Sequence, residues 1–428
     1  MINRCFAVAA LATMTVMNIA SAADLERADP ASAGMNPAAL AKLKVQMTAL
    51  VENGDRSGLA YAIARDGKIV AMEALGKRNL ERNLPMEIDT QFRVYSMTRP
   101  FTGSAALSLI EEGKLSLDDQ VAKYIPDVAK MKVMKADKET LEDQRTPLTV
   151  RHLQTYTAGL GYAPDWPAKF SVKQSDVLNP DITIEQGIAN LAKRPLLYQP
   201  GSKWHYGFSG DMLGRVVEVA AGQPLDVVLR QRVLDKVGMP STGFWNSPQD
   251  SAAGRLAEVY GRKGAHDKLV NVSANAPALS SFNRPGKMFS GGGGLVSTVP
   301  DYLRFAQMLL NGGIIDGKRV LKAETVQAML TQQTTADQGS VYWYAPGQFT
   351  SVTGWMWGYS IGVRPENAGA DVPGQPGERG WSGLANTFFL INLKERVAAV
   401  IMAQYQGPNS NDMSAVFREG VYGAIEKR

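Results

Sequence analysis

The stretch FRVYSMTRPFTGSAALSLIEEGKLSLDDQVAKYIP, residues 92–126, joins an extended segment to a helical pattern. The helical pattern runs from Met97 to Glu112, and Gly113 supplies its stop. Ser96 stands where the two segments meet. A serine at this point is most often only a helix N-cap. The free N–H groups of a helix N-terminus also stabilise developing negative charge, so this is a favourable place for a nucleophilic serine.

Strand patterns lie at both ends of the chain, with helical patterns between them. Two apolar runs flank Asp66-Gly67, which is a strong signal for a hairpin. Two further apolar runs, within residues 385–404, predict a second hairpin, and residues 355–363 read as another strand. We therefore expect an α+β fold, in which the two ends form one antiparallel sheet flanked by helices and a mainly helical domain is inserted in the middle.

The composition shift places the predicted domain boundaries. Residues 24–119 and 285–428 would form the sheet domain, and residues 120–284 the mainly helical domain. Hydrophobic residues make up 45% of the chain, enough for a large core.

The first residues, MINRCFAVAALATMTVMNIASAA, have the pattern of a secretory signal peptide. A short apolar stretch follows Arg4 and is too short for a typical membrane span. Residues 20–22 form a small-x-small cleavage site. We expect residues 1–22 to be removed near Ala22, which predicts a periplasmic or secreted protein with no stable membrane insertion. The alternative is an uncleaved N-terminal anchor.

Several classes of function are disfavoured by the residue counts. Cys5, within the predicted signal peptide, is the only cysteine, so the mature chain would have no thiol nucleophile. The net charge of +5 is not concentrated in a basic stripe, which argues against a nucleic-acid partner. The three histidines, His152, His205 and His266, form no zinc-binding pattern, so we expect no metal and no cofactor.

A GxSxG motif occurs at residues 358–362, around Ser360. In α/β-hydrolases the triad histidine follows such a serine in the chain. All three histidines precede Ser360 here, and the segment after it cannot form a helix. We therefore interpret the motif as part of a glycine-bearing strand.

Residues 92–126 closely resemble the nucleophile region of the serine β-lactamase and penicillin-binding protein superfamily, whose SxxK motif opens a central helix. The nearest branch is the class C-like group, which includes the family VIII carboxylesterases. Four further blocks resemble that group in the same order: RHLQTYTAGL (151–160), YQPGSKWHYGFSGDMLGRVVEVAAG (198–222), FSGGGGLVSTVPDYLRFAQMLLNGG (289–313) and GWSGLANTFFLINLKERVAAVIMAQ (380–404). The resemblance implies the β-lactamase/transpeptidase-like fold.

The same resemblance implies a set of site residues. Ser96 would be the catalytic serine and Tyr206 the base. The oxyanion donors would be the N–H groups of Ser96 and of Leu384, which follows the Trp381-Ser382-Gly383 motif. The implied chemistry is an acyl-enzyme route, and Trp381 is expected to line the acyl site.

Three positions depart from the β-lactamase pattern. Trp381-Ser382-Gly383 stands where β-lactamases carry Lys-Thr-Gly, and Phe208 replaces the Asn of the tyrosine motif. Both changes remove polar substrate contacts, which favours neutral esters over penicillins. Arg99 stands in place of the SxxK lysine. Because a guanidinium stays protonated, it cannot accept the serine proton, but its charge can support a tyrosinate at Tyr206.

The sequence thus favours a serine hydrolase that acts on small-molecule esters or amides. Two alternatives stay open. One is a catalytically impaired homologue that binds a peptidoglycan fragment or a partner, and the other is an acyltransferase.

Overall fold

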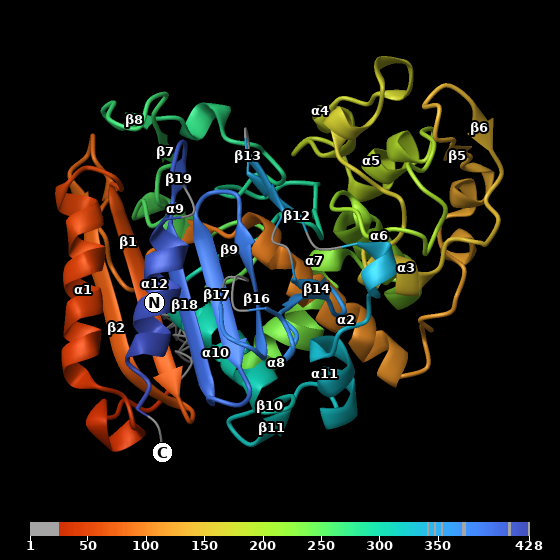
Figure 1. The fold of residues 1–428 in the computed structure, drawn as a ribbon. Helices are drawn as coiled ribbons and strands as arrows, with labels where there is room; N and C mark the ends of the chain where they lie inside the picture. Colours follow the sequence, from red (N-terminus) through yellow and green to blue (C-terminus); the bar gives the residue numbers. More distant parts are fainter. Residues whose placement is uncertain are drawn as a thin grey trace, which may run out of the picture.

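An eight-stranded antiparallel sheet joins the two ends of the chain (Figure 1). The computed structural model describes residues 25–339, 342–345, 348–351, 354–369, 374–409 and 412–426. In spatial order the strands are β14 (Met356–Trp357), β15 (Gly362–Val363), β16 (Glu378–Gly383), β17 (Thr387–Asn392), β18 (Val397–Ala403), β1 (Gly58–Arg65), β2 (Lys68–Asn79) and β3 (Leu84–Pro85). The pairing of β1 with β18 brings the N-terminal and C-terminal hairpins together, which confirms the predicted fold class.

Twelve α-helices lie in the described part of the chain. They are α1 (Pro37–Glu52), α2 (Arg99–Glu111), α3 (Val150–Gln154), α4 (Gln174–Val177), α5 (Ile184–Leu191), α6 (Ser209–Ala221), α7 (Leu225–Leu229), α8 (Asp235–Val237), α9 (Pro248–Ala252), α10 (Val299–Leu310), α11 (Ala323–Leu330) and α12 (Asp412–Gly423). Of these, α6 and α8 end at a glycine in the left-handed conformation. The helix α10 begins after Thr298 because the side chain of this residue accepts a hydrogen bond from the Asp301 N–H and so caps the helix.

Short two- and three-stranded ribbons complete the fold. They are β4 (Phe92–Arg93) with β9 (Val296–Ser297), β5 (Val133–Met134) with β6 (Leu141–Glu142), β10 (Ile314–Ile315) with β11 (Lys318–Arg319), β12 (Tyr342–Ala345) with β13 (Gln348–Ser351), and β7 (Tyr260–Gly261) between β8 (Val270–Asn271) and β19 (Tyr405–Gln406). The β4–β9 pair matters for the site, because it holds the segment that leads into Ser96.

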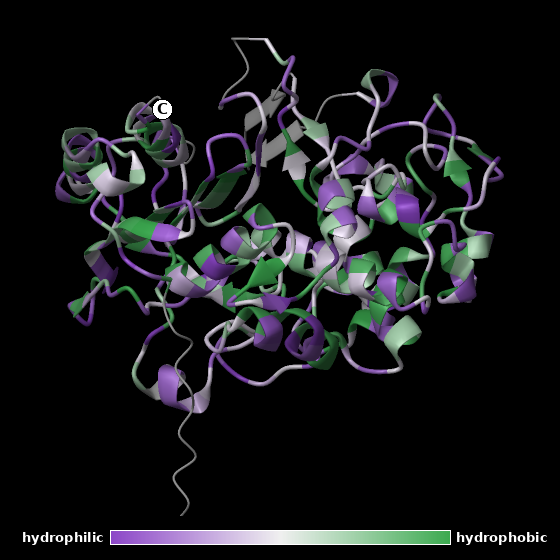
Figure 2. Ribbon diagram, turned by 90° about the horizontal axis from the view of Figure 1, so that it is seen from below, coloured by the Kyte–Doolittle hydropathy of each residue, from purple (hydrophilic) through white to green (hydrophobic). Residues whose placement is uncertain are grey.

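The sheet has a separate hydrophobic core on each face. On one face α1 and α12 pack against β1 and β18, where the rings of Tyr61 and Phe417 lie 5.6 Å apart. On the other face α10 and α2 pack together through the stacked rings of Phe101 and Phe305, 4.0 Å apart. Figure 2 shows hydrophobic residues concentrated in this interior and hydrophilic residues on the peripheral loops. The helix that follows Ser96 is therefore anchored in the larger core.

The mainly helical part lies beside the sheet and contains α3, α4, α5 and α6 (Figure 1). The exact boundaries at residues 119/120 and 284/285 stay a prediction. The predicted signal peptide, residues 1–22, lies outside the described residues. Within the described part of the chain, no helix combines the length and apolar character needed to cross a membrane.

The expectation of a single strand over residues 355–363 is wrong. The structure has two short strands, β14 and β15, joined by a turn in which Ser360 has a φ of 58°. The Ser360 hydroxyl is buried and donates to Gln154 Oε1 at 2.7 Å. Gly358 and Ser360 break the strand because the chain must reverse here to pair β14 with β15. A buried, bonded hydroxyl in a turn is not placed as a nucleophile.

Candidate active site

Ser96 lies in a 3-10 turn, Tyr95–Thr98, between β4 and α2. The turn begins with Tyr95 at a φ of 43°, a conformation that a bulky residue adopts only when its surroundings enforce it. Tyr95 is fully buried against Phe282, which provides that enforcement. From Thr90 to Leu109, Ser96 is the one residue that is not buried. The turn therefore presents a single serine at the surface of a packed core.

The strand that carries the Trp381-Ser382-Gly383 motif packs directly against this turn. A Cβ at Gly383 would stand 2.3 Å from the carbonyl oxygen of Val94, so only glycine permits the approach. Thr387 Oγ1 donates to the same oxygen at 3.4 Å. Leu384, the next residue after β16, belongs to the small cluster that contains Tyr95. The structure thus brings Leu384 beside the Ser96 turn, and the role of their N–H groups as oxyanion donors stays a prediction.

Arg99 begins α2, three residues after Ser96, and is 1% exposed. The Arg99 N–H donates to the Ser96 carbonyl, so Arg99 directly follows the turn that holds the serine, on the same side of it. Its Nε donates to the phenol oxygen of Tyr206 at 2.6 Å, and its Nη1 donates to the Gly292 carbonyl at 2.6 Å. Its Nη2 donates to the phenol oxygen of Tyr162. Arg99 therefore links the predicted base to the helix that carries the nucleophile.

The phenol oxygen of Tyr206 also accepts a hydrogen bond from Trp381. The indole Nε1 of Trp381 lies 3.0 Å from it, and the two ring centroids are 5.4 Å apart. Trp381 is 3% exposed, whereas Tyr206 is half-buried. Two N–H donors directed at one oxygen, one of them cationic, favour negative charge on that oxygen. The arrangement suits a base, and a contact of Trp381 with an acyl group stays a prediction.

Further aromatic residues surround Tyr206, and three of them, Tyr156, Tyr162 and Trp204, are not identified from the sequence. Tyr156 is fully buried and stacks on it with centroids 5.8 Å apart. Tyr162 contacts it edge-on, and Trp204 and Trp357 complete the group. Tyr156 and Tyr162 lie in or next to the 151–160 block, so that block was the available signal.

Burial raises the pKa of both Tyr156 and Tyr162, and the neighbouring charge of Arg99 only partly opposes it. Both phenols therefore stay neutral. Burial alone would lower the pKa of Arg99, but the surrounding phenols and Asp211 outweigh it and hold that pKa above its ordinary value. Arg99 is therefore a permanent cation in the site.

Phe208 caps the start of α6 and has no exposed surface. Its ring packs edge-on against Tyr162 with centroids 5.1 Å apart. The structure thus gives Phe208 a supporting position behind Tyr162 and not an open face toward substrate. Ser382, in contrast, is partly exposed on β16.

The three histidines occupy separate places. His152 Nδ1 lies 3.1 Å from the Thr149 N–H at the start of α3, and His205 Nε2 lies 3.1 Å from Asp165. His266 is exposed. Within the described ranges, no group of three His, Cys, Asp or Glu side chains is placed to hold a metal.

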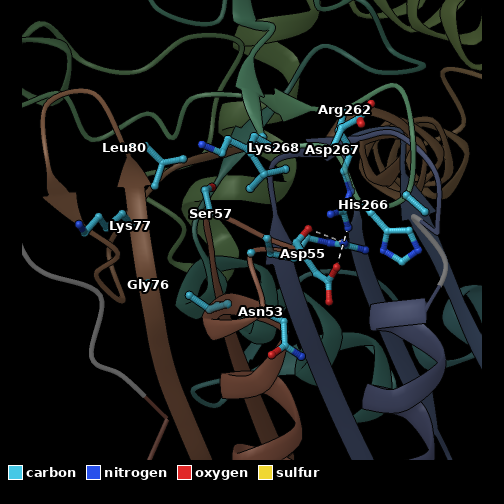
Figure 3. Close-up of a pocket in the computed structure, with 15 residues that line it drawn as sticks. Asn53, Asp55, Ser57, Gly76, Lys77, Leu80, Arg262, His266, Asp267 and Lys268 are labelled. Carbon is cyan, nitrogen blue, oxygen red and sulfur yellow. Dashed lines mark hydrogen bonds and ion pairs between the residues drawn. The ribbon is translucent and has the colours of Figure 1, made fainter.

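A hollow of about 730 Å³ lies at the ends of β1 and β2, where Arg56, Ser57, Lys77 and Lys268 are among its lining residues (Figure 3). Arg56 is buried and its three nitrogens are all bound to protein acceptors. One of these acceptors is Asn386 Oδ1, at 2.6 Å, in the β16–β17 turn just after Leu384. The wall of this hollow thus supports the turn that carries the predicted oxyanion donor.

The family described as beta-lactamase matches residues 44–420, nearly the whole of the described chain. This chain belongs to the β-lactamase family. The membership confirms the resemblance inferred from the five sequence blocks. It also confirms that the chain is an enzyme of the serine hydrolase class.

Two curated relatives and one solved structure are similar to this chain over most of its length. An uncharacterized protein of Mycobacterium tuberculosis is 31% identical over 374 residues, covering 84% of this chain and 88% of that protein. Esterase EstB of Burkholderia gladioli is 29% identical over 413 residues, covering 92% and 98%. The structure of EstCE1, described as a hydrolase with promiscuous acyltransferase activity, is 25% identical, covers 90% of this chain and 99% of its own, and superimposes with a TM-score of 0.74.

Proposed function

We propose that the protein is an esterase that cleaves small neutral acyl esters through an acyl-enzyme on Ser96. Two observations support the proposal: the phenol oxygen of Tyr206 receives hydrogen bonds from Arg99 and Trp381, and Ser96 is the partly exposed residue of the turn that leads into Arg99. The similarity to esterase EstB over almost the full length of both chains supports it.

In the first half-reaction, Ser96 Oγ attacks the ester carbonyl carbon while the Tyr206 phenolate takes the hydroxyl proton. The tetrahedral oxyanion is stabilised by the N–H groups of Ser96 and Leu384. The intermediate then collapses: the bond to the leaving alcohol breaks, and Tyr206 returns its proton to the alkoxide oxygen. The products are an acyl-Ser96 ester and a free alcohol.

In the second half-reaction, water replaces the alcohol. Tyr206 takes a proton from the water as the water oxygen attacks the acyl carbon. The bond between the acyl carbon and Ser96 Oγ then breaks, Tyr206 returns the proton to Oγ, and a carboxylic acid leaves. Arg99 takes no proton in either step, because guanidinium stays protonated. Its contribution is electrostatic, since its Nε donates a charge-assisted hydrogen bond to the phenol oxygen.

The substrate preference follows from what the site lacks. The Trp381-Ser382-Gly383 motif offers no cation for a substrate carboxylate, and Trp381 points its N–H at Tyr206. A charge-assisted hydrogen bond contributes roughly 1.5 to 3 kcal/mol, so its absence lowers penicillin turnover by about one to two decades. Neutral acyl esters lose nothing by its absence.

Acyl transfer to an alcohol is a second candidate, favoured by the similarity to EstCE1 with its promiscuous acyltransferase activity. It differs only in the nucleophile of the second half-reaction. We place the reaction in the periplasm or outside the cell, as the predicted signal peptide indicates.

The test compares ester and penicillin turnover by the purified protein without residues 1–22. We expect p-nitrophenyl butyrate to be cleaved and benzylpenicillin to be turned over at least tenfold more slowly. Benzylpenicillin turnover that matches ester turnover would contradict the substrate class. Added alcohol that diverts most of the product from acid to ester would establish acyl transfer instead.

A further inference from the structure

Asp211 is a buried acid in the third position of α6, close to Arg99. Its side chain is 1% exposed. One carboxylate oxygen, Oδ1, accepts hydrogen bonds from Ser290 Oγ at 2.5 Å and from the Gly292 N–H at 3.1 Å. The other oxygen, Oδ2, is buried and has no hydrogen-bond partner among the described residues. A buried carboxylate oxygen without a partner is costly unless a positive charge compensates it.

The unpartnered oxygen faces Arg99 across a glycine. A Cβ at Gly292 would stand 2.5 Å from Asp211 Oδ2 and 2.6 Å from Arg99 Nη1. A Cβ at Gly210 would stand 3.1 Å from the same Nη1 and 2.8 Å from the Tyr156 hydroxyl. The two glycines therefore leave room for a planar guanidinium, which is larger than the ammonium of the lysine that the SxxK motif usually carries.

We infer that Asp211 is the counter-ion of Arg99 and a positioning residue for the reaction. The positioning role rests on the proposed function. The carboxylate lies on the Nη1 side of the guanidinium, and Tyr206 accepts from the Nε side. Attraction to Asp211 thus fixes the rotation of the guanidinium so that Nε stays directed at the phenol oxygen. The charge of Asp211 acts on Arg99 across the Gly292 backbone, so the two opposite charges offset each other in the interior.

The titratable groups that face this pair are Tyr156, Tyr162 and Tyr206. Burial raises the pKa of Asp211 above its ordinary value, and the charge of Arg99 works against that rise. The negative charge of Asp211 also offsets part of the positive field of Arg99 at Tyr206. Removing it should therefore have two effects: poorer orientation of Arg99 and a stronger positive field at the phenol oxygen.

The first experiment measures the pH dependence of ester cleavage by Asp211→Asn, which keeps the size of the side chain and an acceptor for Ser290. We expect kcat at high pH to fall about tenfold, equivalent to the loss of one well-placed interaction, with little change in KM. We expect the rising limb of the profile to move to lower pH. A purely structural role would reduce the amount of folded enzyme and leave the profile in place, which would overturn the inference. Glu218→Gln, two turns later on the same helix, is the matched control and should not move the profile.

The second experiment measures thermal unfolding of Asp211→Asn in two backgrounds, the natural Arg99 and Arg99→Met. With Arg99 present, the substitution should lower Tm, because it leaves a buried cation uncompensated. With Arg99→Met, the same substitution should leave Tm unchanged or raise it, because it then removes an uncompensated carboxylate. Equal losses in both backgrounds would show that Asp211 acts only through Ser290 and Gly292, and would overturn the inference. This cycle needs no activity, so a protein that cleaves no ester would refute the proposed function and leave the cycle to decide on Asp211.

Discussion

The Nε atom of Arg99 donates a hydrogen bond of 2.6 Å to the phenol oxygen of Tyr206, and the guanidinium carbon lies 4.4 Å from the centroid of the same ring. Arg99 stands where the SxxK motif has lysine. Arg99 can stabilise a tyrosinate by its charge, as a protonated lysine would. It cannot accept a proton, as a neutral lysine would, because a guanidinium stays protonated.

Substitutions of Arg99 and Tyr206 should therefore differ in kind. Arg99→Lys should keep or increase ester cleavage, because a lysine supports the phenolate when it is protonated and accepts a proton when it is a neutral amine. Arg99→Met should lower kcat/KM by about two decades or more, because the phenol loses its cationic donor. Tyr206→Phe should abolish activity. Steady-state rates between pH 6 and pH 9, with circular dichroism as a check of folding, measure all three, and an active Tyr206→Phe would exclude this base.

Trp381 should affect the pH profile through its N–H. Trp381→Phe keeps a ring beside Tyr206 but removes the donor 3.0 Å from the phenol oxygen. We expect kcat to fall roughly tenfold and the rising limb of the profile to move to higher pH, because phenolate loses one of its two donors. Trp357→Phe is the matched control, since the Trp357 N–H bonds the Gln154 carbonyl instead. A shift of the profile in both variants would point to general loosening of the aromatic group.

Arg56 should influence turnover from outside the site. Arg56→Lys cannot reach Asn386 together with its two carbonyl acceptors, because an ammonium lacks the planar fork. The turn after Leu384 should then loosen, and we expect kcat to fall about tenfold while KM changes little. Arg78→Lys, another buried arginine bonded to backbone carbonyls, is the control and should lower Tm without changing kcat. Equal kcat values for Arg56→Lys and the natural protein would exclude this support.

Stability should depend on pH through Asp301, next to Tyr302, whose hydroxyl donates to the Met97 carbonyl. Burial raises the pKa of Asp301 from 3.8 to about 6. The native state therefore holds a proton that the unfolded state releases between these values, so the free energy of unfolding falls as pH rises through this window. The decrease from this group amounts to at most roughly 3 kcal/mol. Urea unfolding at pH 4 and pH 7 should show the decrease in the natural protein and a smaller one in Asp301→Asn, and identical pH dependence would contradict it.

Local patterns predicted the elements, and the order of motifs predicted the fold. Asp66-Gly67 marks its hairpin because both residues adopt positive φ, at 51° and 80°. The turn at Ser360 was missed because its cause is tertiary: β14 must reverse to pair with β15, and Gln154 holds the serine from a distant helix. The hydrophobic periodicity of the local sequence does not indicate a partner that is distant in the chain.

Some features of the candidate site could likewise be predicted from the sequence, and others could not. Ser96, Tyr206 and the Trp381 motif could be assigned from sequence because each lies in a block that resembles the family. The hydrogen bond from Trp381 to Tyr206 could not be predicted, because the two residues are 175 positions apart. The position of Asp211 near Arg99 could not be predicted either, because it depends on the space left by two glycines. Those contacts appear only once the sheet and the helical part are packed together.

The most direct test of the account is the covalent state of Ser96. The protein without residues 1–22 is incubated at pH 9 with a fluorophosphonate and, separately, with p-nitrophenyl butyrate, and the adduct is located by mass spectrometry of its peptides. We expect a single adduct on the peptide that contains Ser96, absent in Ser96→Ala and strongly reduced in Tyr206→Phe. An adduct on a different serine, or no adduct in the natural protein while Arg99→Lys becomes labelled, would contradict it and show that Arg99 disables the site.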